Sequence, residues 1–385
     1  MSLMLINDET YGHDVKSINK HRDKTFEDKK ALDLFISDID EFIELYIKPY
    51  KYVFIDEFHY AKQGGSKLKY IFDTSKAKLF ISGSSSIDLT VQAVEYLVGR
   101  IFVFSLFPLD FEEFLSFRSP ILLKFYQKNK IKLNNHSKNE LALLSKTTAE
   151  QLKKYFQEYV IFGGYPRVVL SESQEEKKQV LKNIYNTYFL REVKDILGLV
   201  DDYKLSQMVK ALALQIGGLI EYQEIANVSG LSYQTVKGYL NFLNKTFIAF
   251  FVKPYFSNKR TEIVKNPRVY FFDTGLRNYI ANDFRMLDSR TDDGCLLENG
   301  LAMQLVKQDI DFNFWRTKQQ FEIDFIVSLS GSQKIAIEVK KDAKLSNINT
   351  RATKEFSVKY PNIPIFFCGF KEFQKAKDFI FIPLF

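Results

Sequence analysis

Four side chains near the end of the chain have the types and the spacing that metal-assisted hydrolysis needs. Glu338 follows Asp324 after 13 intervening residues, and Lys340 stands two positions beyond Glu338. Positions i and i+2 of a strand face the same way, so Glu338 and Lys340 would lie side by side. Two acids can bind Mg²⁺ with its water ligands, and the lysine can orient or deprotonate the nucleophile. Glu298, in a preceding helical segment, can supply a supporting carboxylate.

The surrounding sequence predicts the elements that hold these side chains. Residues 294–308 carry leucines at helical spacing, and a second helix is predicted near 349–360. Strand-like apolar runs occupy residues 312–316, 322–327, 334–340, 363–368 and 379–383. This order and the acid spacing match the PD-(D/E)xK pattern of many nucleases, so we predict such an α/β domain over residues 273–385. The bare spacing also arises by chance in chains rich in Lys and Glu.

A second pair of acids lies near the start of the chain. The apolar run 52–55 predicts a buried parallel strand, and it is followed directly by Asp56 and Glu57. An acid at such a strand end can hold the water shell of Mg²⁺, and its neighbour can polarise an attacking water, as nucleotide hydrolysis requires. Many buried strands end in acids, so the pair alone is a weak signal.

Three further residues strengthen this second pattern. The next strand-like run, 78–81, is followed by Ser82 and Ser84, whose hydroxyls can sense a γ-phosphate. Arg100 offers a guanidinium for phosphate charge and opens a third strand-like run, 100–107. Strands that alternate with helices through short loops predict a parallel α/β sheet.

A helix-turn-helix pattern lies between the two acid sets. Residues 222–229 predict a short helix, Gly230 a turn, and Ser232 the N-cap of a second helix over 233–246. Two strand-like runs would then bracket a basic hairpin, as in a winged helix, at residues 249–254 and 268–272.

This middle region carries nearly all of the surplus positive charge. The formal net charge is +7, and residues 230–270 hold seven Lys and Arg against the single acid Glu262. Such clustering indicates a polyanion, and DNA is the expected partner. The residues predicted to reach base edges or phosphates are Tyr233, Gln234, Lys237, Lys259, Arg260, Lys265 and Arg268. A docking surface for a protein partner, or a plain solvated face, is the alternative.

The order and spacing of these motifs resemble a group of prokaryotic AAA+-like ATPases that carry a C-terminal domain of unknown function. The matching pieces are VFIDEFHY, LFISGSSSIDL, EYLVGR, FPLDFEEFL, FGGYPRVVL, GLSYQTVKGYL, FFDTGLRN, LLEN, FWRTKQQFEIDFIV and IAIEVKK. The resemblance implies ATP and Mg²⁺ as cofactors, with Asp56 near the metal and Glu57 in the catalytic position. It also implies that Ser82, Ser84 and Arg100 lie near the nucleotide.

One part of that family's pattern is absent from the sequence. No Gly-x-x-x-x-Gly-Lys-Ser/Thr loop precedes Asp56, and the segment Gly64-Gly65-Ser66-Lys67 follows it instead. Such a loop cradles phosphates through backbone N–H groups and a lysine, so we expect little ATP hydrolysis by this chain. Residues 3–7 would be the family's second strand. The sheet would then have a gap, or a wrong neighbour for the strand at 100–107.

Composition bounds these interpretations. With 46% hydrophobic and 26% charged residues, the chain is typical of folded globular proteins, and no apolar stretch approaches the roughly 20 residues that span a bilayer. Two cysteines and four scattered histidines exclude a cysteine-rich or histidine-rich metal site. We therefore predict a cytoplasmic protein with no membrane partner.

The predicted fold is a multidomain α/β protein in four parts. They are a partial AAA+-like P-loop sheet (1–118), a helical lid or linker (119–204), a winged helix-turn-helix (205–272) and a PD-(D/E)xK nuclease-like domain (273–385). The predicted activity is Mg²⁺-dependent and directed at nucleic acid, with Asp324, Glu338 and Lys340 carrying cleavage. The alternative is a non-catalytic DNA- or protein-binding regulator with a degenerate nuclease fold.

Overall fold

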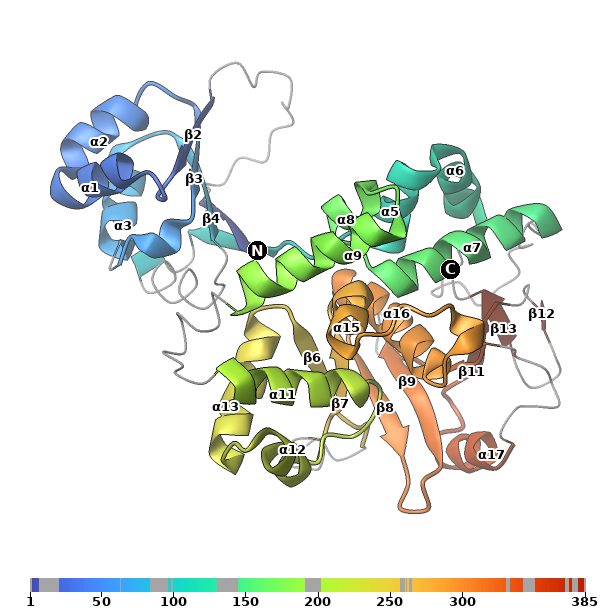
Figure 1. The fold of residues 1–385 in the computed structure, drawn as a ribbon. Coiled ribbons are helices and arrows are strands. Elements are labelled where there is room, and N and C mark those ends of the chain that lie inside the picture. The colour runs from blue at the N-terminus through green and yellow to red at the C-terminus, as the bar shows by residue number, and fades with distance from the viewer. Residues whose placement is uncertain are drawn as a thin grey trace. The chain divides into compact units, whose positions relative to one another are not determined.

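The computed structural model places most of the chain in two compact units, Met1–Phe107 and Pro108–Phe385 (Figure 1). It describes residues 2–6, 21–62, 64–83, 96–97, 100–129, 145–190, 202–256, 260, 262, 265–329, 333–341, 350–370, 374–375 and 380–383. The division falls before Pro108 rather than at the predicted boundary of 118, because the helix over Phe111–Arg118 packs against helices of the second unit. No helix among the described residues is long and apolar enough to cross a membrane.

The first unit is built on a five-stranded sheet in the order β2-β3-β4-β1-β5. Its strands are β1 (Ser2–Ile6), β2 (His21–Thr25), β3 (Tyr52–Asp56), β4 (Lys78–Gly83) and β5 (Ile101–Ser105). β2, β3 and β4 are parallel, which confirms the predicted parallel pairing of the runs at 52–55 and 78–81. Asp56 at the end of β3, Glu57 directly after it and the Ser82 hydroxyl near the end of β4 therefore lie at one sheet edge.

The sequence predicts a gap in the sheet or a wrong neighbour for the strand at 100–107, and the structure shows the second: β5 pairs with β1. β1 runs antiparallel between β4 and β5, while β2 lies beside β3. Leu3 pairs with Ser82 on one side and with Phe104 on the other. The sheet therefore has no gap there, because β1 satisfies the backbone groups of both neighbours, which would otherwise form two unpaired edges.

Helices cover the parallel strands of the first unit. They are α1 (Lys29–Ser37), α2 (Ile39–Tyr46), the 3-10 turn η1 (Phe58–Tyr60) and α3 (Gly65–Thr74). Asp28 caps α1 by accepting from the N–H of Lys30, and Asp38 caps α2 by accepting from Glu41. The rings of Phe35, Phe42 and Phe58 are fully buried against the strands.

The second unit begins with a helical region, as predicted. Its helices are α5 (Phe111–Arg118), α6 (Pro120–Asn129), α7 (Lys146–Phe162), α8 (Pro166–Leu170), α9 (Gln174–Asn183) and the π-helix η2 (Ile184–Leu190). Asp110 and Glu113 form a capping box at the start of α5. Phe111, Phe114 and Tyr159 are buried between α5 and α7, which fixes the two helices to one another.

A three-helix segment with a two-stranded hairpin follows. It consists of α11 (Asp202–Leu214), α12 (Tyr222–Ser229), α13 (Tyr233–Lys245), β6 (Ala249–Val252) and β7 (Arg268–Phe271). Gly230 ends α12 in the left-handed conformation at φ 66°, and the Ser232 hydroxyl accepts from the N–H of Thr235 at 3.1 Å. Both predicted helix boundaries are therefore confirmed. β6 and β7 pair antiparallel.

The end of the chain forms a six-stranded sheet in the order β12-β13-β11-β10-β9-β8. Its elements are α15 (Thr274–Ala281), η3 (Leu287–Ser289), α16 (Asp293–Lys307), β8 (Phe312–Arg316), β9 (Glu322–Ser328), β10 (Lys334–Val339), α17 (Thr350–Lys359), β11 (Ile365–Gly369), β12 (Gln374–Lys375) and β13 (Ile380–Pro383). β8, β9 and β10 are antiparallel, while β10, β11 and β13 are parallel. α16 contacts β10, and α17 contacts β9 (Figure 1).

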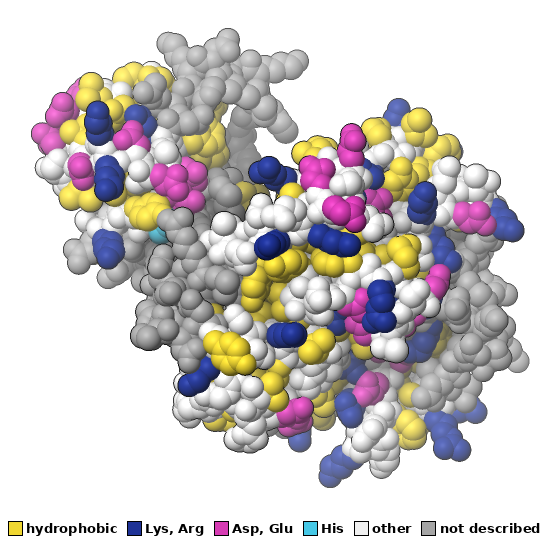
Figure 2. Space-filling model, in the orientation of Figure 1, with side chains coloured by type: hydrophobic (Ala, Val, Ile, Leu, Met, Phe, Trp, Pro, Cys, Tyr) yellow, Lys and Arg dark blue, Asp and Glu magenta, His cyan; other side chains and the backbone are white. Residues whose placement is uncertain are grey.

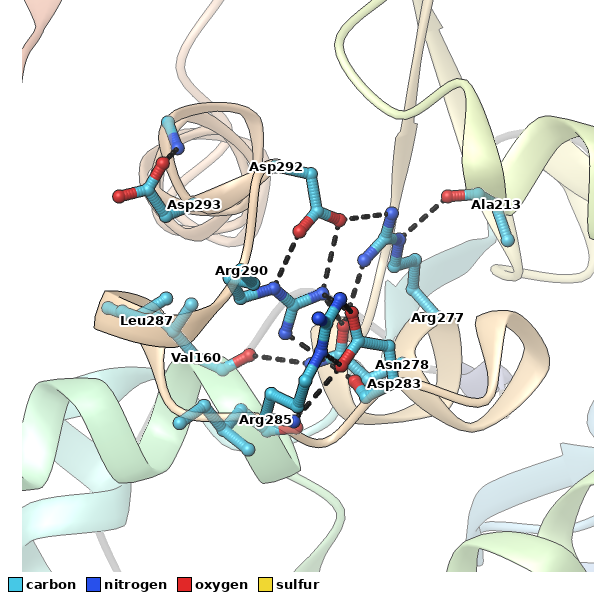
Figure 3. A network of polar contacts seen from close by, with 12 residues as sticks. Val160, Ala213, Arg277, Asn278, Asp283, Arg285, Leu287, Arg290, Asp292 and Asp293 are labelled. Carbon is cyan, nitrogen blue, oxygen red and sulfur yellow. Dashed lines mark hydrogen bonds and ion pairs between the residues drawn. The ribbon is translucent and has the colours of Figure 1, made fainter.

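A buried polar network fixes the start of α16 (Figure 3). Arg277 of α15 is 1% exposed and forms an ion pair with Asp292 at 2.7 Å. Arg290 is 6% exposed and reaches the other oxygen of Asp292 at 2.6 Å. Asn278 accepts from both guanidinium groups and donates to the carbonyl oxygen of Ile161 at the end of α7. α7, α15 and α16 are thus joined where α16 begins.

Close backbone approaches join the same elements at the Gly-Gly-Tyr-Pro turn. The carboxylate of Asp273 caps α15 by accepting from Leu276 at 2.8 Å and accepts from the N–H of Gly164 at 2.7 Å. Gly163 has φ 80°, and a Cβ there would collide with the carboxylate of Asp273. A Cβ on Gly275 would lie 1.9 Å from the carbonyl oxygen of Phe162. This turn is a packing element that joins α7 to α15.

Candidate acid site in the C-terminal sheet

Three of the four predicted acid-site residues come from adjacent strands. Asp324 lies on β9 and Glu338 on β10, one step beyond the antiparallel pair Ile337 and Phe325. Lys340 follows β10 directly. Because β9 and β10 pair in this register, side chains that are far apart in sequence project together from the same face of the sheet.

The contacts within this group are close. The ammonium of Lys340 lies 3.0 Å from Glu338 Oε2 and 4.0 Å from Asp324 Oδ2. Asp324 Oδ2 also accepts from the backbone N–H of Val339 at 2.9 Å. The side chains of Asp324 and Glu338 are 8% exposed, whereas that of Lys340 is 40% exposed. The opening of the site toward solvent therefore lies on the Lys340 side.

The carboxyl groups influence one another. Burial, and then the charge of Asp324, raise the pKa of Glu338 to about 8, against the opposing charge of Lys340. Burial and the charge of Asp324 also raise the pKa of Glu298 well above its ordinary value. Burial lowers the pKa of Lys340, but the charges of Asp324 and Glu338 more than offset this and raise it. At neutral pH the raised pKa values favour the protonated, neutral forms of Glu338 and Glu298, and a cation that binds here would have to displace those protons.

Glu298 reaches the site from α16, one helical turn after the half-buried Cys295. Its Oε2 accepts from the hydroxyl of Tyr270 on β7 at 3.4 Å. The turn at Gly217 closes this side: it has φ 74°, and a Cβ there would lie 3.3 Å from Glu298 Oε2 and 3.4 Å from the Cβ of Cys295. The helix start fixed by Asp292 and the turn at Gly217 together position the Glu298 carboxylate.

The prediction that Arg268 contacts DNA phosphates is wrong. Arg268 is 3% exposed, and its guanidinium binds Glu322 on β9 while lying 3.8 Å from Asp324 Oδ1 and 3.9 Å from Glu298 Oε2. β7 packs against α16, so the side chain of its first residue, Arg268, points toward the acid group and not toward solvent. Three carboxylates make a buried guanidinium tolerable there.

Two site residues were therefore missed by sequence reasoning. Arg268 and Tyr270 are i and i+2 on β7 and face the same way, toward Glu298. The signal in the sequence is a basic residue and a tyrosine alternating within the apolar run Arg268–Phe272. A charged side chain inside a strand that is otherwise apolar needs a partner, and here the partners are acids.

The carboxylates suit a hard divalent cation by their chemistry, since Asp and Glu oxygens are the ligands that Mg²⁺ prefers. Among the described residues, however, no group of three or more Asp, Glu, His or Cys side chains is already arranged to hold a metal. Asp324 and Glu338 form the closest acid pair, and Glu298 is linked to Asp324 through Arg268. The carboxylates are suitable ligands for such an ion. In this structure Lys340 and Arg268, rather than a metal ion, balance their charge.

The structure also brings together part of the predicted nucleotide site in the first unit. The Ser82 hydroxyl donates to Asp56 Oδ1, which joins the ends of β3 and β4. Glu57 has a left-handed backbone at φ 53°, and its carboxylate lies 3.0 Å from His59 Nδ1. A left-handed residue directly after a strand is a local strain of the kind found at functional sites.

Two other residues of that prediction are placed elsewhere or not described. Arg100 lies 2.7 Å from Asp73 and stacks over the ring of Phe72, so its guanidinium is engaged at the end of α3 rather than beside Asp56. Ser84 lies outside the described residues.

The predicted nucleic-acid contacts on α13 lie on an exposed face. Tyr233, Gln234 and Lys237 are exposed, and the ammonium of Lys237 lies 4.6 Å from the ring centre of Tyr233 and 5.7 Å from that of Tyr222. Arg260 and Lys265 are also exposed, whereas Lys259 lies outside the described residues. On the face of the second unit shown in Figure 2, the described Lys and Arg side chains are spread singly or in small groups among neutral ones.

Comparisons with known families match three regions of the chain. Residues 9–115 match a family model described as an AAA domain. Residues 153–287 and 293–384 match two domains of unknown function, DUF8612 and DUF4143. The first match covers β2 to β5 of the first unit's sheet but not β1, and the last covers α16 and all strands of the C-terminal sheet.

Relatives match most of the chain at low identity. An uncharacterized protein of Methanocaldococcus jannaschii is 24% identical, covering 87% of this chain and 77% of its own length. An uncharacterized protein of Haemophilus influenzae is 25% identical over 71% of this chain and 62% of its own, and one of Mycobacterium tuberculosis is 23% identical over 57% and 51%. The chain thus spans only about half to three quarters of the length of these curated relatives.

A solved half-complex of Thermococcus gammatolerans McrB AAA+ hexamers with bound McrC covers 80% of this chain and 74% of that chain at 10% identity. Its TM-score is 0.19, which is too low to carry an argument. The family matches support an AAA-like ATPase family as the class to which this chain is related, and the parallel strands β2, β3 and β4 are consistent with such a fold.

Proposed function

We propose that the second unit is a Mg²⁺-dependent phosphodiesterase directed at nucleic acid. The observation that carries this proposal is the meeting of Asp324, Glu338 and Lys340 at one position of the C-terminal sheet, with the lysine within 4.0 Å of both acids and open to solvent. This combination of a carboxylate pair and a solvent-facing lysine is what the chemistry of phosphodiester hydrolysis requires.

The residues of the site divide the chemistry among them. Asp324 and Glu338 would hold Mg²⁺, which when bound activates water and stabilises charge on the phosphate. Lys340, whose raised pKa keeps it protonated, would orient the attacking water and offset charge on the phosphate while the new P–O bond forms and the P–O bond to the leaving oxygen breaks. Glu298 acts from α16 by holding the acid pair in place through Tyr270 and Arg268.

A plasmid-nicking assay tests this proposal. Supercoiled plasmid with Mg²⁺ should be nicked by the wild type, and Asp324→Asn should reduce the rate at least about 100-fold because one of two metal-binding carboxylates loses its charge. Asp311→Asn is the matched control, since Asp311 is exposed in the loop before β8 and should leave nicking unchanged. A wild type that nicks no faster than Asp324→Asn contradicts the proposal.

A second candidate function has its own observation. The Asp324 and Glu338 side chains are only 8% exposed, and Arg268 already compensates the acids, as expected of a degenerate site in a non-catalytic DNA- or protein-binding regulator. In that case DNA would bind through α13 without cleavage. Lys237→Ala should weaken binding and reduce its salt dependence, because a phosphate contact releases counterions. An unchanged salt slope points to a protein partner instead.

For the first unit we propose a nucleotide-related role with little hydrolysis of its own. Asp56 and Ser82 meet at the sheet edge where AAA-like ATPases bind nucleotide, but no phosphate-binding loop of the Gly-Lys-Ser/Thr type precedes them in the sequence. Purified protein should show ATP turnover near the background rate. Substantial turnover that Glu57→Gln abolishes would contradict this expectation.

A further inference from the structure

The Arg268 guanidinium is buried in the acid site without being fully hydrogen-bonded. Its Nη2 is fixed by Glu322, which also binds Arg316 at 2.9 Å. Its Nη1 lies 3.8 Å from Asp324 and 3.9 Å from Glu298, within ion-pair range but beyond hydrogen-bond distance. Its Nε is buried and has no hydrogen-bond partner among the described residues.

Arg277, in the same unit, shows what a fully satisfied buried arginine looks like. Its Nε donates to the carbonyl oxygen of Ala213 at 2.7 Å, its Nη1 to Asn278 at 3.0 Å, and its Nη2 pairs with Asp292 at 2.7 Å (Figure 3). All three nitrogens are used, as expected for a structural arginine. Arg268 is equally buried and bonds to Glu322 and to the side chain of Tyr270, but its Nε has no partner among the described residues and its Nη1 lies beyond hydrogen-bond distance of both Asp324 and Glu298.

From this contrast we infer that Arg268 is the resident cation of the acid site and that its guanidinium, which lies beside Asp324 and Glu298, competes with a divalent metal ion for the Asp324 carboxylate. The inference rests on the proposed metal site and states how that site is controlled. A guanidinium and a metal ion cannot share these carboxylates at such distances, because like charges repel strongly where water is excluded. Metal binding therefore requires Nη1 of Arg268 to leave.

The anchor on Glu322 sets the path of this exchange. Glu322 and Asp324 are i and i+2 on β9 and face the same way, so Arg268 can keep its bond to Glu322 while its other nitrogen withdraws. The ring of Phe314, 4.7 Å from the guanidinium, offers a second surface for it. β7 is paired with β6. A movement of Arg268 on metal binding would therefore shift β7 and, through this pairing, the hairpin that follows the helix-turn-helix segment.

Calorimetric titration of the full chain with Mn²⁺ alone tests the inference. Arg268→Gln removes the competing charge and should bind Mn²⁺ at least ten times more tightly than the wild type. Arg268→Lys keeps a charge and should stay within about threefold of the wild type. Arg316→Gln is the matched control, because it removes the other cation bound to Glu322 without approaching Asp324, and it should leave the affinity unchanged.

The possible results distinguish failure of the competition by Arg268 from failure of the proposed phosphodiesterase function. Equal Mn²⁺ affinity of wild type and Arg268→Gln, with plasmid nicking still dependent on Asp324, overturns the competition and leaves the proposed function standing. Weaker binding by Arg268→Gln also overturns it. No Mn²⁺ binding by either protein overturns both. Because Arg268→Gln can impair folding, amide exchange of the wild type provides a second measurement: Mn²⁺ should speed exchange at residues 268–271, and slower or unchanged exchange contradicts the inference.

Discussion

Asp292 offsets the charge of two buried arginines, and this single carboxylate is a weak point of the second unit. Burial raises its pKa, but hydrogen bonds and charges from Arg290 and Arg277 lower it below the ordinary value overall. The folded chain thus depends on Asp292 being ionised. Its position directly before α16 links this local balance to Glu298, which the same helix carries into the acid site.

Replacing Asp292 tests that dependence. Asp292→Asn leaves Arg277 and Arg290 without a counter-charge and should lower the free energy of unfolding by about 3 kcal/mol, measured by urea denaturation. Asp288→Asn serves as the control, since the Asp288 side chain is 79% exposed and forms a surface ion pair with Lys341, so a change below about 0.5 kcal/mol is expected. Equal effects of the two variants would show that the network carries little stability.

Lys307 makes a second residue-scale prediction, for pH dependence. Its ammonium donates to the carbonyl oxygen of Leu109 at 2.9 Å and lies 3.1 Å from the Tyr159 hydroxyl. Burial lowers its pKa to about 8, against the opposing charges of Asp273 and Asp110. Because the folded pKa lies below the unfolded value near 10.5, the protonated lysine costs stability below pH 8, and this cost disappears as pH rises toward 10.5.

Lys307→Met should therefore be more stable than the wild type at pH 7, by on the order of 2 kcal/mol, with the difference shrinking between pH 8 and 10.5. Leu109 keeps a donor in the variant, because the Tyr159 hydroxyl also donates to it at 2.9 Å. Denaturation at pH 7 and pH 9.5 measures the change, with the exposed Lys182→Met as control. If the stability difference between Lys307→Met and the wild type grew as the pH rises, the prediction that burial lowers the pKa of Lys307 would be wrong.

At the scale of elements, the backbone contact between α7 and α15 determines how the helical region meets the C-terminal sheet. Gly275 begins α15 so close to Phe162 that no side chain fits. Gly275→Ala should lower the free energy of unfolding by at least about 2 kcal/mol. Gly238→Ala is the matched control: nothing lies within 4 Å of a Cβ there, and a gain of about 0.5–1 kcal/mol is expected because alanine favours the helix. If Gly275→Ala left the free energy of unfolding unchanged, the backbone at Phe162 would have to move aside without cost, which contradicts the prediction.

Sequence patterns predicted the elements whose information is local. The runs 52–55 and 78–81, the cap at Ser232 and the shared face of Glu338 and Lys340 all follow from neighbouring residues. The role of Arg268 did not follow, since its partner Glu322 lies 54 residues away and only the fold joins them. The position of β1 was missed for a similar reason: its apolar residues fit any open sheet position, and only tertiary pairing selects one.

At the scale of the whole molecule, the two units have separate hydrophobic cores. The core of the first is formed around Phe35, Phe42 and Phe58, while the second has clusters around Trp315 and around Phe162. A unit with its own core can fold alone. The acid site, the helix-turn-helix segment and the polar network at Asp292 all lie within Pro108–Phe385.

A fragment of residues 108–385 should therefore fold cooperatively without the first unit. Circular dichroism should show a thermal midpoint within about 5 °C of the corresponding transition in the full chain, since the hydrophobic clusters around Trp315 and Phe162 are retained in the fragment. The fragment should also retain any Mn²⁺ binding by the full chain. An unfolded fragment, or a midpoint lowered by more than about 10 °C, would show that the units stabilise each other.

The half-buried thiol of Cys295 lets the acid site be followed without any substrate. Burial, and next the charge of Glu298, raise its pKa to about 11, so almost none of it is reactive thiolate at neutral pH. Cys368, the other cysteine, is only 2% exposed and reacts more slowly still. A cation that offsets the carboxylates beside Cys295 lowers the pKa of this thiol and speeds its reaction with a disulfide reagent. The rate at which Cys295 reacts with the reagent therefore reports whether a cation occupies the acid site.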